Sequence, residues 1–220
     1  MPFRTTAEAV RAWVEGWAAS RCAAEPTPHS WGFTIDVGLA KEVARHVLTD
    51  ADEATVRELA GDTTVTGVPL KTFVPPETLK AWLPPGWVLL DGHAGLMAAS
   101  LSAVEAPPGL PDGYRLHSWH RAGVTRVVVR AADGAFAARG QIAVTGPTAA
   151  VDQVETDAAH QRRGLGRVVM GTLAEAAARQ GARTAVLGAT VQGRALYEAL
   201  GWKVVAPMSA AVRSARDGGA

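Results

Sequence analysis

The sequence predicts an α/β protein with a mixed sheet in its C-terminal half. Residues 149–156 are mostly apolar and partly β-branched, which is typical of a strand. Residues 165–176 carry apolar side chains at helical spacing, and residues 184–187 form a second short apolar run. A strand, a helix and a strand within about 35 residues form a βαβ unit, so the two strands are expected to be parallel with a right-handed crossover.

Three more strands are predicted just before this unit. They cover residues 114–119, 125–130 and 136–144, and Asp133-Gly134 between the last two is a strong hairpin signal. Gly146-Pro147 then turns the chain into the βαβ unit. The expected order is therefore three antiparallel strands, the parallel unit, a helix from 192 and a final strand at 202–205.

The N-terminal half opens with a predicted helix at residues 6–20. Thr5 and Glu8 have the spacing of a capping box. An apolar stripe with helical spacing follows, and we interpret it as core: Val10, Trp13, Val14 and Trp17.

The remaining N-terminal elements are shorter. Alternation predicts a strand at residues 33–37. The spacing of Leu39, Val43 and Val47 predicts a second helical face, with Arg45-His46 on its solvated side. Further along the chain we expect a short helix at 50–60, an extended segment at 65–73, a helical turn at 77–82 and a strand at 87–90.

A proline-rich stretch at residues 106–113 separates the two halves, because proline fixes φ and removes backbone donors. We expect an N-terminal α/β region at 1–106, a second domain at 107–212 and a flexible tail at 213–220. The two halves are also compatible with one shared sheet. The sequence shows no internal repeat.

Composition excludes several classes of protein. The 220 residues include 48% hydrophobic side chains and carry a net charge of +1, with no long basic run, so a nucleic-acid partner is not expected. No stretch is long and apolar enough for a membrane span, and no signal peptide is evident. The single cysteine, Cys22, allows no internal disulfide and favours a cytoplasmic protein.

The loop at residues 160–167 has the chemistry of an anion site. Gly164 and Gly166 allow the backbone to approach a ligand closely, and the helix that begins there presents unpaired N–H groups. Three cations adjoin them: Arg162, Arg163 and Arg167.

Two common phosphate motifs are absent from this loop. A dinucleotide fingerprint would need glycine where Val169 stands, and an ATP loop would need lysine where Thr172 stands.

Two motifs carry a resemblance to a known family. Gln161-x-x-Gly164-x-Gly166 is similar to the pyrophosphate-binding motif of the GNAT N-acetyltransferase superfamily, and Leu196-Tyr197-x-x-Leu200-Gly201-Trp202 is similar to its last helix. The resemblance covers roughly residues 113–210. It implies the GNAT fold, preceded by a divergent α/β region, and acetyl-CoA as cosubstrate. The cofactor-binding residues it implies are Val154, Thr156, Gln161, Arg162, Arg163, Gly164, Leu165, Gly166 and Arg167.

The sequence departs from the family at one point. The family places two helices between its first and second strands, where they shape the acceptor site, whereas only residues 120–124 lie between the corresponding strands here. Those helices are therefore missing, or residues 1–106 supply them.

The resemblance also implies catalytic roles. Tyr197 aligns with the family's general acid, which protonates the departing thiolate; the alternative is that Tyr197 only packs against the sheet. Asp152 or Glu155 is the candidate base that relieves an alkylamine of its proton. Their odd spacing on a regular strand sends them to opposite faces, with Asp152 beside Val154 and Thr156, unless a bulge turns Glu155 inward. The alternative is that one of them is a buried structural carboxylate and the other a surface carboxylate.

We therefore expect an acetyl-CoA-dependent N-acetyltransferase that acts on a small or protein amine in a ternary complex, without a covalent acetyl-enzyme. The alternatives are a non-catalytic acyl-CoA-binding regulator and a transferase for a longer acyl chain. A metal is not expected, because His117 and His120 lack acidic or cysteine neighbours in sequence.

Overall fold

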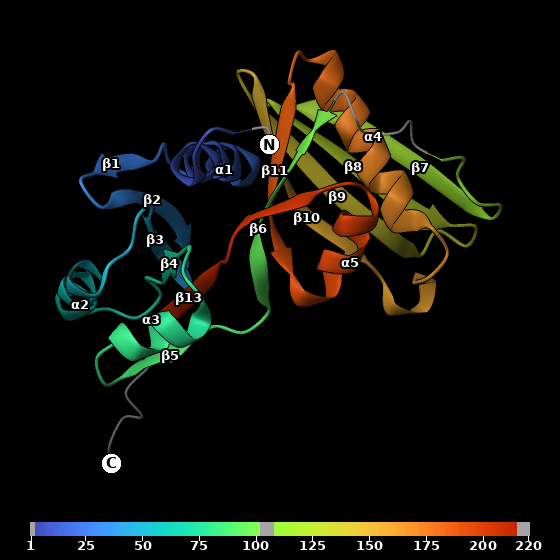
Figure 1. Cartoon of the computed structure of the whole chain (residues 1–220). Coiled ribbons are helices and arrows are strands. Elements are labelled where there is room, and N and C mark those ends of the chain that lie inside the picture. The colour runs from blue at the N-terminus through green and yellow to red at the C-terminus, as the bar shows by residue number, and fades with distance from the viewer. Residues whose placement is uncertain (1–2, 102–107, 215–220) are drawn as a thin grey trace.

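The computed structural model describes residues 3–101 and 108–214, which form two lobes, each built on a mixed sheet. Figure 1 shows the two lobes side by side. The strand order is β1-β2-β3-β4-β13-β5 in the N-terminal lobe and β12-β6-β11-β10-β9-β8-β7 in the C-terminal lobe. The N-terminal lobe contains α1 (Thr6–Arg21), β1 (Thr27–His29), β2 (Gly32–Leu39), β3 (Glu42–Leu48), α2 (Glu53–Asp62), β4 (Leu70–Thr72), α3 (Pro76–Trp82), β5 (Trp87–Leu89) and β13 (Ser209–Arg213). The C-terminal lobe contains β6 (His93–Ser100), β7 (Tyr114–Arg121), β8 (Val124–Ala131), β9 (Phe136–Thr145), β10 (Thr148–Thr156), α4 (Leu165–Arg179), β11 (Thr184–Thr190), α5 (Val191–Ala199) and β12 (Lys203–Ala206).

The C-terminal lobe has the predicted α/β architecture. Strands β7 to β10 are successively antiparallel, and β10 pairs in parallel with β11 across the crossover helix α4. Helices α4 and α5 pack on one face of this sheet around a core that includes Leu165, Leu173 and Tyr197. The fold class predicted from the sequence is confirmed.

Helix α1 joins the two lobes. The Thr5 side chain accepts a hydrogen bond from the Glu8 amide (3.1 Å), as the capping box predicts. The predicted apolar stripe is buried, and it packs against both sheets: Trp13 and Trp17 lie in one cluster with Phe33, Ile35 and Val47 of the N-terminal lobe and Ala150 and Val186 of the C-terminal lobe. The stripe is therefore core.

The predicted helix through Leu39, Val43 and Val47 is wrong, because these residues lie in strands β2 and β3. A spacing of four residues fits one face of a helix and also one face of a strand. The β-branched valines favour the strand, and the hairpin partner β2 completes it. Arg45 is also not solvated: its side chain is only 13% exposed and is paired with Glu42.

Each lobe receives one strand from the other half of the chain. Strand β6 pairs with β11 and β12, whereas β13 pairs with β4 and β5. Neither strand was predicted. Arg213, expected in a flexible tail, pairs in β13 with Trp87, and its Nη1 donates to the Thr63 carbonyl (3.2 Å). The boundary expected near 107 and the tail from 215 lie outside the described residues.

The two sheets share a topology that the sequence does not reveal. In the N-terminal lobe, β1-β2-β3 are antiparallel, α2 leads to the parallel strand β4, and α3 leads to β5, with β13 between β4 and β5. In the C-terminal lobe, β8-β9-β10, α4, β11, α5, β12 and the inserted β6 follow the same scheme. The architecture is therefore a tandem repeat with a reciprocal exchange of strands.

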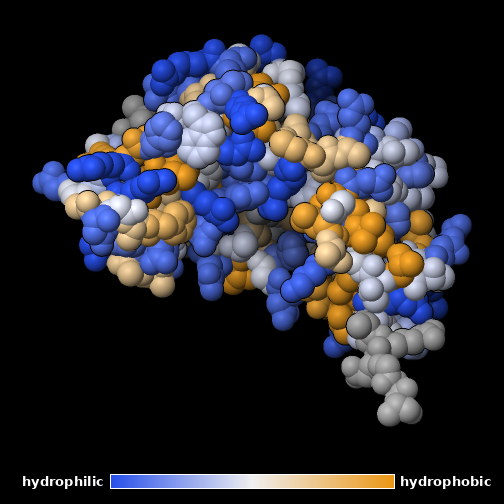
Figure 2. Space-filling model, turned by 180° about the vertical axis from the view of Figure 1, so that it is seen from behind, coloured by the Kyte–Doolittle hydropathy of each residue, from blue (hydrophilic) through white to orange (hydrophobic). Residues whose placement is uncertain are grey.

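Helix α1 also lies where the C-terminal sheet lacks helices of its own. Strands β7 and β8 are joined by a tight turn at Ala122 (φ 51°) and Gly123 (φ 76°). Helix α1 covers β9, β10 and β11 on the face opposite α4, and a Cβ atom at Gly16 would collide with Ala150. Seen from behind, the molecule is hollowed between the two lobes (Figure 2).

Within the described ranges, none of the helices has the length and apolar character that crossing a membrane requires.

Candidate active site

The parallel strands β10 and β11 separate after a short contact. They pair only from Thr148 to Ala150 on one side and from Thr184 to Val186 on the other. Beyond that point β10 continues to pair with β9, and β11 continues to pair with β6. The edge of β10 that includes Val154 and Thr156 therefore has no strand partner among the described residues. An extended ligand could pair with this edge.

A bulge reshapes β10 beside this opening. Gln153 has φ 53°, and the register with β9 shifts between Asp152 and Glu155. Asp152 lies opposite Gln141 and Glu155 lies opposite Arg139. Because residues 139 and 141 of β9 share a face, the bulge brings both carboxylates to the same face of the sheet.

The regular alternation expected for this strand is therefore wrong. Val154 faces the other way, towards α4, where it lies in the core with Val169 and Leu173. Asp152 and Val154 thus occupy opposite faces, because the extra residue in the bulge inverts the alternation after Asp152.

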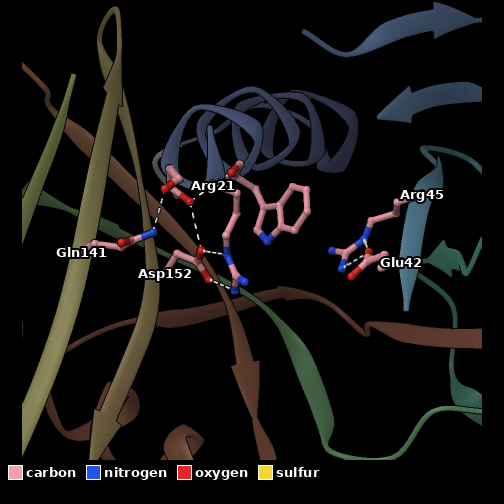
Figure 3. Close-up of polar contacts among 7 residues, drawn as sticks. Arg21, Glu42, Arg45, Gln141 and Asp152 are labelled. Carbon is pink, nitrogen blue, oxygen red and sulfur yellow. Dashed lines mark hydrogen bonds and ion pairs between the residues drawn. The ribbon is translucent and has the colours of Figure 1, made fainter. Parts of the chain in front are cut away.

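Asp152 is held by the end of α1 (Figure 3). The Ser20 hydroxyl donates to its Oδ2 (2.9 Å), the Arg21 Nη2 donates to its Oδ1 (3.0 Å), and the Arg21 Nε also donates to Oδ2. The Gln141 side chain donates to the Ser20 carbonyl (2.7 Å) and completes the link between α1 and the sheet. The hydrogen bond with Asp152 raises the pKa of Arg21.

Glu155 is more exposed than Asp152. Its side chain is 52% exposed, accepts a hydrogen bond from the Arg139 Nε (2.9 Å) and forms an ion pair with the Arg139 Nη2 (2.9 Å). The Asp152 side chain is only 13% exposed. The two candidate bases thus lie on the same face of the sheet. Asp152 is enclosed by its contact with α1, and Glu155 lies at the edge of that contact.

Tyr197 lies on α5 and is 7% exposed. Its ring packs near Trp202, with 6.1 Å between ring centroids. Burial raises the pKa of Tyr197 to about 12, and the nearby Asp152 charge adds to this effect. Its hydroxyl has no hydrogen-bond partner in the described part of the chain. The phenol therefore stays protonated at neutral pH and is free to donate.

The loop before α4 supplies an open helix N-terminus. Gly164 is the N-cap of α4, with φ 81° and no side chain to bond the first amides. Asp157 does not reach this position, because it caps the preceding turn by accepting from the Ala159 amide (2.9 Å). Gln161 donates to the Thr156 carbonyl at 3.4 Å. The N–H groups at the start of α4 thus remain available to an anion.

Three exposed arginines surround this helix end: Arg162, Arg163 and Arg167. None of them forms an ion pair with a described residue. Leu165 points into the core instead (1% exposed). Gly166 serves packing, because a Cβ there would lie 2.8 Å from the Leu196 side chain on α5. The second glycine thereby lets the loop approach the helix that carries Tyr197.

Several polar residues of the N-terminal lobe adjoin the site, and the sequence did not single them out. The guanidinium of Arg45 lies 4.1 Å from the centroid of the Trp17 ring, and that of Arg21 lies 5.5 Å from it. Figure 3 shows Arg45 with Glu42 across the gap from Arg21 and Asp152. Burial lowers the pKa of Arg45. The contact of Arg45 with Trp17 joins residues far apart in the chain, so no local pattern could have revealed it.

The buried Lys71 contacts the half-buried His93. The Lys71 Nζ lies 2.7 Å from the His93 Nε2, and Lys71 is 5% exposed. Burial lowers the pKa of Lys71 well below its usual value, and lowers that of His93 to about 4. Lys71 has no carboxylate partner among the residues described. The sequence signal for this buried lysine is its position between Leu70 and Thr72 in a short strand whose residues are all buried.

The comparisons with known proteins agree with this geometry. Residues 97–202 match the model of the acetyltransferase (GNAT) family. No curated protein sequence matches the chain.

Solved structures resemble the chain in fold. A GCN5-related N-acetyltransferase from Kribbella flavida has a TM-score of 0.63 at 17% identity, covering 97% of this chain and 96% of that chain. A protein named as an acetyltransferase of the GNAT family from Novosphingobium aromaticivorans has a TM-score of 0.55 at 16% identity, covering 92% and 94%. A tandem GNAT protein of the clavulanic acid biosynthesis pathway has a TM-score of 0.52 at 17% identity, covering 74% and 69%. The fold shared with these structures agrees with the match of residues 97–202 to the GNAT acetyltransferase family, and this part of the chain is similar to that family.

Proposed function

We propose that the protein is an acetyl-CoA-dependent N-acetyltransferase that moves an acetyl group to a primary amine by direct attack in a ternary complex. The observation that carries the proposal is the conjunction of three features at one opening. These are the separated strands β10 and β11, the uncapped N-terminus of α4 and the buried phenol of Tyr197. Each feature suits a different part of a thioester substrate.

Residues of the loop and of β10 hold the cosubstrate in this proposal. The amides of Leu165 and Gly166 and the side chains of Gln161, Arg162, Arg163 and Arg167 surround a pyrophosphate. The backbone of Val154 and Thr156 pairs with the pantetheine arm in the manner of an added strand. Acetyl-CoA supplies an acetyl group on a thiol leaving group.

In this proposal Tyr197 is the general acid that protonates the departing thiolate. As the amine nitrogen bonds to the carbonyl carbon, the carbon–sulfur bond breaks and the thiolate needs a proton. A phenol with a pKa of about 12 stays protonated, and it donates to that thiolate. Because a thiol titrates near ~8.5, the phenolate cannot be the end state. Tyr197 therefore recovers a proton from the attacking nitrogen, which becomes acidic as its new bond forms.

In this proposal a carboxylate at the bulge of β10 is the base that removes a proton from the amine. Asp152 lies close enough to Tyr197 for its charge to raise the pKa of the phenol, and its Oδ1 accepts only one hydrogen bond from a described residue. We assign the amine contact to Asp152, with Glu155 at the rim as the alternative base.

Calorimetry with acetyl-CoA tests the cosubstrate site. We expect micromolar binding by the wild type and a loss of at least 100-fold for Gly164→Asp, which places a carboxylate at the open helix end. Gly61→Asp is the matched control, since Gly61 has open space around it far from the loop and should bind normally. Equal affinities in all three proteins would overturn the assignment.

A chemical assay tests turnover. The purified protein is incubated with acetyl-CoA and a panel of primary amines, and both thiol release and the mass of the acetylated amine are measured. Stoichiometric product and thiol support the proposal. Binding without turnover on any amine, in wild type and Tyr197→Phe alike, would favour a non-catalytic acyl-CoA-binding protein, and turnover only with longer acyl chains would redefine the donor.

A further inference from the structure

One part of the sheet face that carries Asp152 and Glu155 is left uncovered by α1. On strands β7 and β8 this face presents Arg115, His117 and Trp119 from one strand and Arg126, Val128 and Arg130 from the next. A shallow hollow of about 590 Å³ lies here, lined by Arg115, Leu116, His117, Trp119, Val128 and Arg130. Its size is within the range of small-molecule sites.

The strand register connects this hollow to the candidate bases. Trp119 lies opposite Arg126, Arg126 lies opposite Gln141, and Gln141 lies opposite Asp152. Directly opposite residues of antiparallel strands share a face, so these side chains form one row across four strands. Because neighbouring strands are ~4.8 Å apart, Trp119 is roughly 14 Å from Asp152 along the row.

A second row runs parallel to the first. His117 lies opposite Val128, Val128 opposite Arg139, and Arg139 opposite Glu155. One step further along the strands, Arg115 lies opposite Arg130. The hollow therefore begins beside Arg139 and extends away from the site along the sheet.

The charges on this face are unbalanced. Arg115 and Arg130 are directly opposite each other, and like charges in that position destabilise a sheet. Neither they nor Arg126 form an ion pair with any residue in the described ranges. Their two guanidinium charges match a phosphate dianion, which planar guanidinium groups bind in a bidentate manner. A bound phosphate would remove the repulsion.

An apolar ring adjoins these charges. Trp119 is 38% exposed and stacks on His117, with 5.4 Å between centroids and 22° between planes. Charged residues commonly protect the edge strand of a sheet, which would explain Arg115 on β7. That role does not explain the arginines of the inner strand β8 or the exposed Trp119 opposite Arg126.

We propose that the acceptor of this acetyltransferase is an amine that carries a phosphate group, bound with its phosphate between Arg115 and Arg130 and its amine at the bulge of β10. This inference rests on the proposed function and names the substrate class of the same site. From Arg130, two strand spacings and one two-residue step lead to Glu155, and a second such step leads to Asp152, so the amine and the phosphate are roughly 12–17 Å apart. The body of the acceptor lies over Val128, beside the ring of Trp119.

A length series of acceptors tests the proposal. ω-Aminoalkyl phosphates with two to twelve methylenes are compared, at each length, with the amino alcohols that lack the phosphate. We expect kcat/KM to favour the phosphate by at least 10-fold at an intermediate length and to show little preference at the shortest. Equal kcat/KM for both series at every length would overturn the proposal.

Variants locate the effect. Arg115→Gln/Arg130→Gln should remove the preference for phosphate and leave the amino alcohols at their wild-type rate. Arg183→Gln removes the same charge at an exposed turn on the far end of β11, and should retain the preference. A preference that survives the double substitution would place the phosphate elsewhere and contradict the assignment.

A binding measurement separates this inference from the proposed function. Calorimetry with 8-aminooctyl phosphate, without acetyl-CoA, should show binding by the wild type and at least 10-fold weaker binding by the double variant. If acetyl-CoA fails to bind while the aminoalkyl phosphate binds as expected, the proposed function fails and the phosphate site stands. If acetyl-CoA binds and turns over while no aminoalkyl phosphate binds, the phosphate site fails alone. Circular dichroism confirms that each variant is folded.

Discussion

The two lobes share one topology but differ at the positions where a cosubstrate would bind. Helix α2 of the N-terminal lobe and helix α4 of the C-terminal lobe follow equivalent strands. At the start of α2 the Asp52 carboxylate accepts the Thr55 amide (2.8 Å), and this hydrogen bond lowers the pKa of Asp52. At the start of α4 stands Gly164, with no side chain. One helix end thus holds its own anion, and the other remains open to an external one.

The strands beside these helices differ in the same sense. Strand β3 remains bonded along its length to the segment that leads into β4, since Val43 donates to the Gly67 carbonyl (2.8 Å) and His46 donates to the Pro69 carbonyl (3.0 Å). Strand β10 loses its parallel partner β11 after Ala150. The N-terminal lobe is therefore closed where the C-terminal lobe is open. A shared topology carries no site by itself, and the site depends on the helix cap and on where two strands separate.

The two lobes also differ in the helix that follows the parallel strands, because α5 of the C-terminal lobe carries Tyr197 and the corresponding helix α3 contains no tyrosine. We expect the largest effect at this phenol. Tyr197→Phe should lower kcat by roughly 10²–10³-fold, in the range typical of a lost general acid. Acetyl-CoA affinity, measured by calorimetry, should stay within about twofold, since the ring and its packing against Trp202 remain. A variant that keeps wild-type kcat would assign Tyr197 a packing role only.

A smaller effect is expected at the bulge of β10. Asp152→Asn removes the charge that pairs with Arg21 and, in our assignment, the contact with the amine. We expect kcat/KM to fall by about 10²-fold. Glu155→Gln is the control, with an expected loss below tenfold because its side chain lies at the rim. The reverse order of the two effects would transfer the role to Glu155.

The buried Lys71 should make stability depend on pH. Its pKa in the folded protein is lowered well below 10.5 by burial, so the unfolded chain binds a proton that the folded protein does not. The free energy of unfolding should therefore rise with pH between neutral pH and 10.5, and decline as pH falls. In Lys71→Met this part of the slope should disappear. Urea unfolding at several pH values from 7 to 10 measures both slopes, and parallel slopes would show that Lys71 is charged in the folded protein.

Short-range sequence patterns were sufficient to predict much of this fold, and the elements that were not predicted were missed for physical reasons. The Asp133-Gly134 hairpin, the βαβ unit and the α1 stripe all depend on short-range patterns. Strand β6 escaped prediction because His93–Ser100 is rich in alanine and glycine, which have low strand propensity, and its place between β11 and β12 comes from pairing alone.

The candidate site also contains residues that sequence motifs identify and residues that only the tertiary structure brings together. The loop from Gln161 to Arg167 and Tyr197 lie in contiguous motifs and could be identified from the sequence. The contact of Arg21 with Asp152 joins residues 131 positions apart, and the rows across β7 to β10 depend on register. A bulge at Gln153 then decides which face Glu155 occupies, and no local signal in the strand marks that extra residue.

The smallest expected effect returns to the closed helix end of the N-terminal lobe. Asp52→Ala removes the cap of α2 and should lower the free energy of unfolding, measured as a lower midpoint of urea unfolding. Acetyl-CoA binding should not change, because β3 stays bonded to the segment before β4 and no arginine cluster adjoins Asp52 in the described structure. A second equivalent of acetyl-CoA bound by Asp52→Ala would show that the carboxylate alone separates the two lobes. One equivalent in both proteins would mean that an anion site needs the open strand pair as well as the open helix.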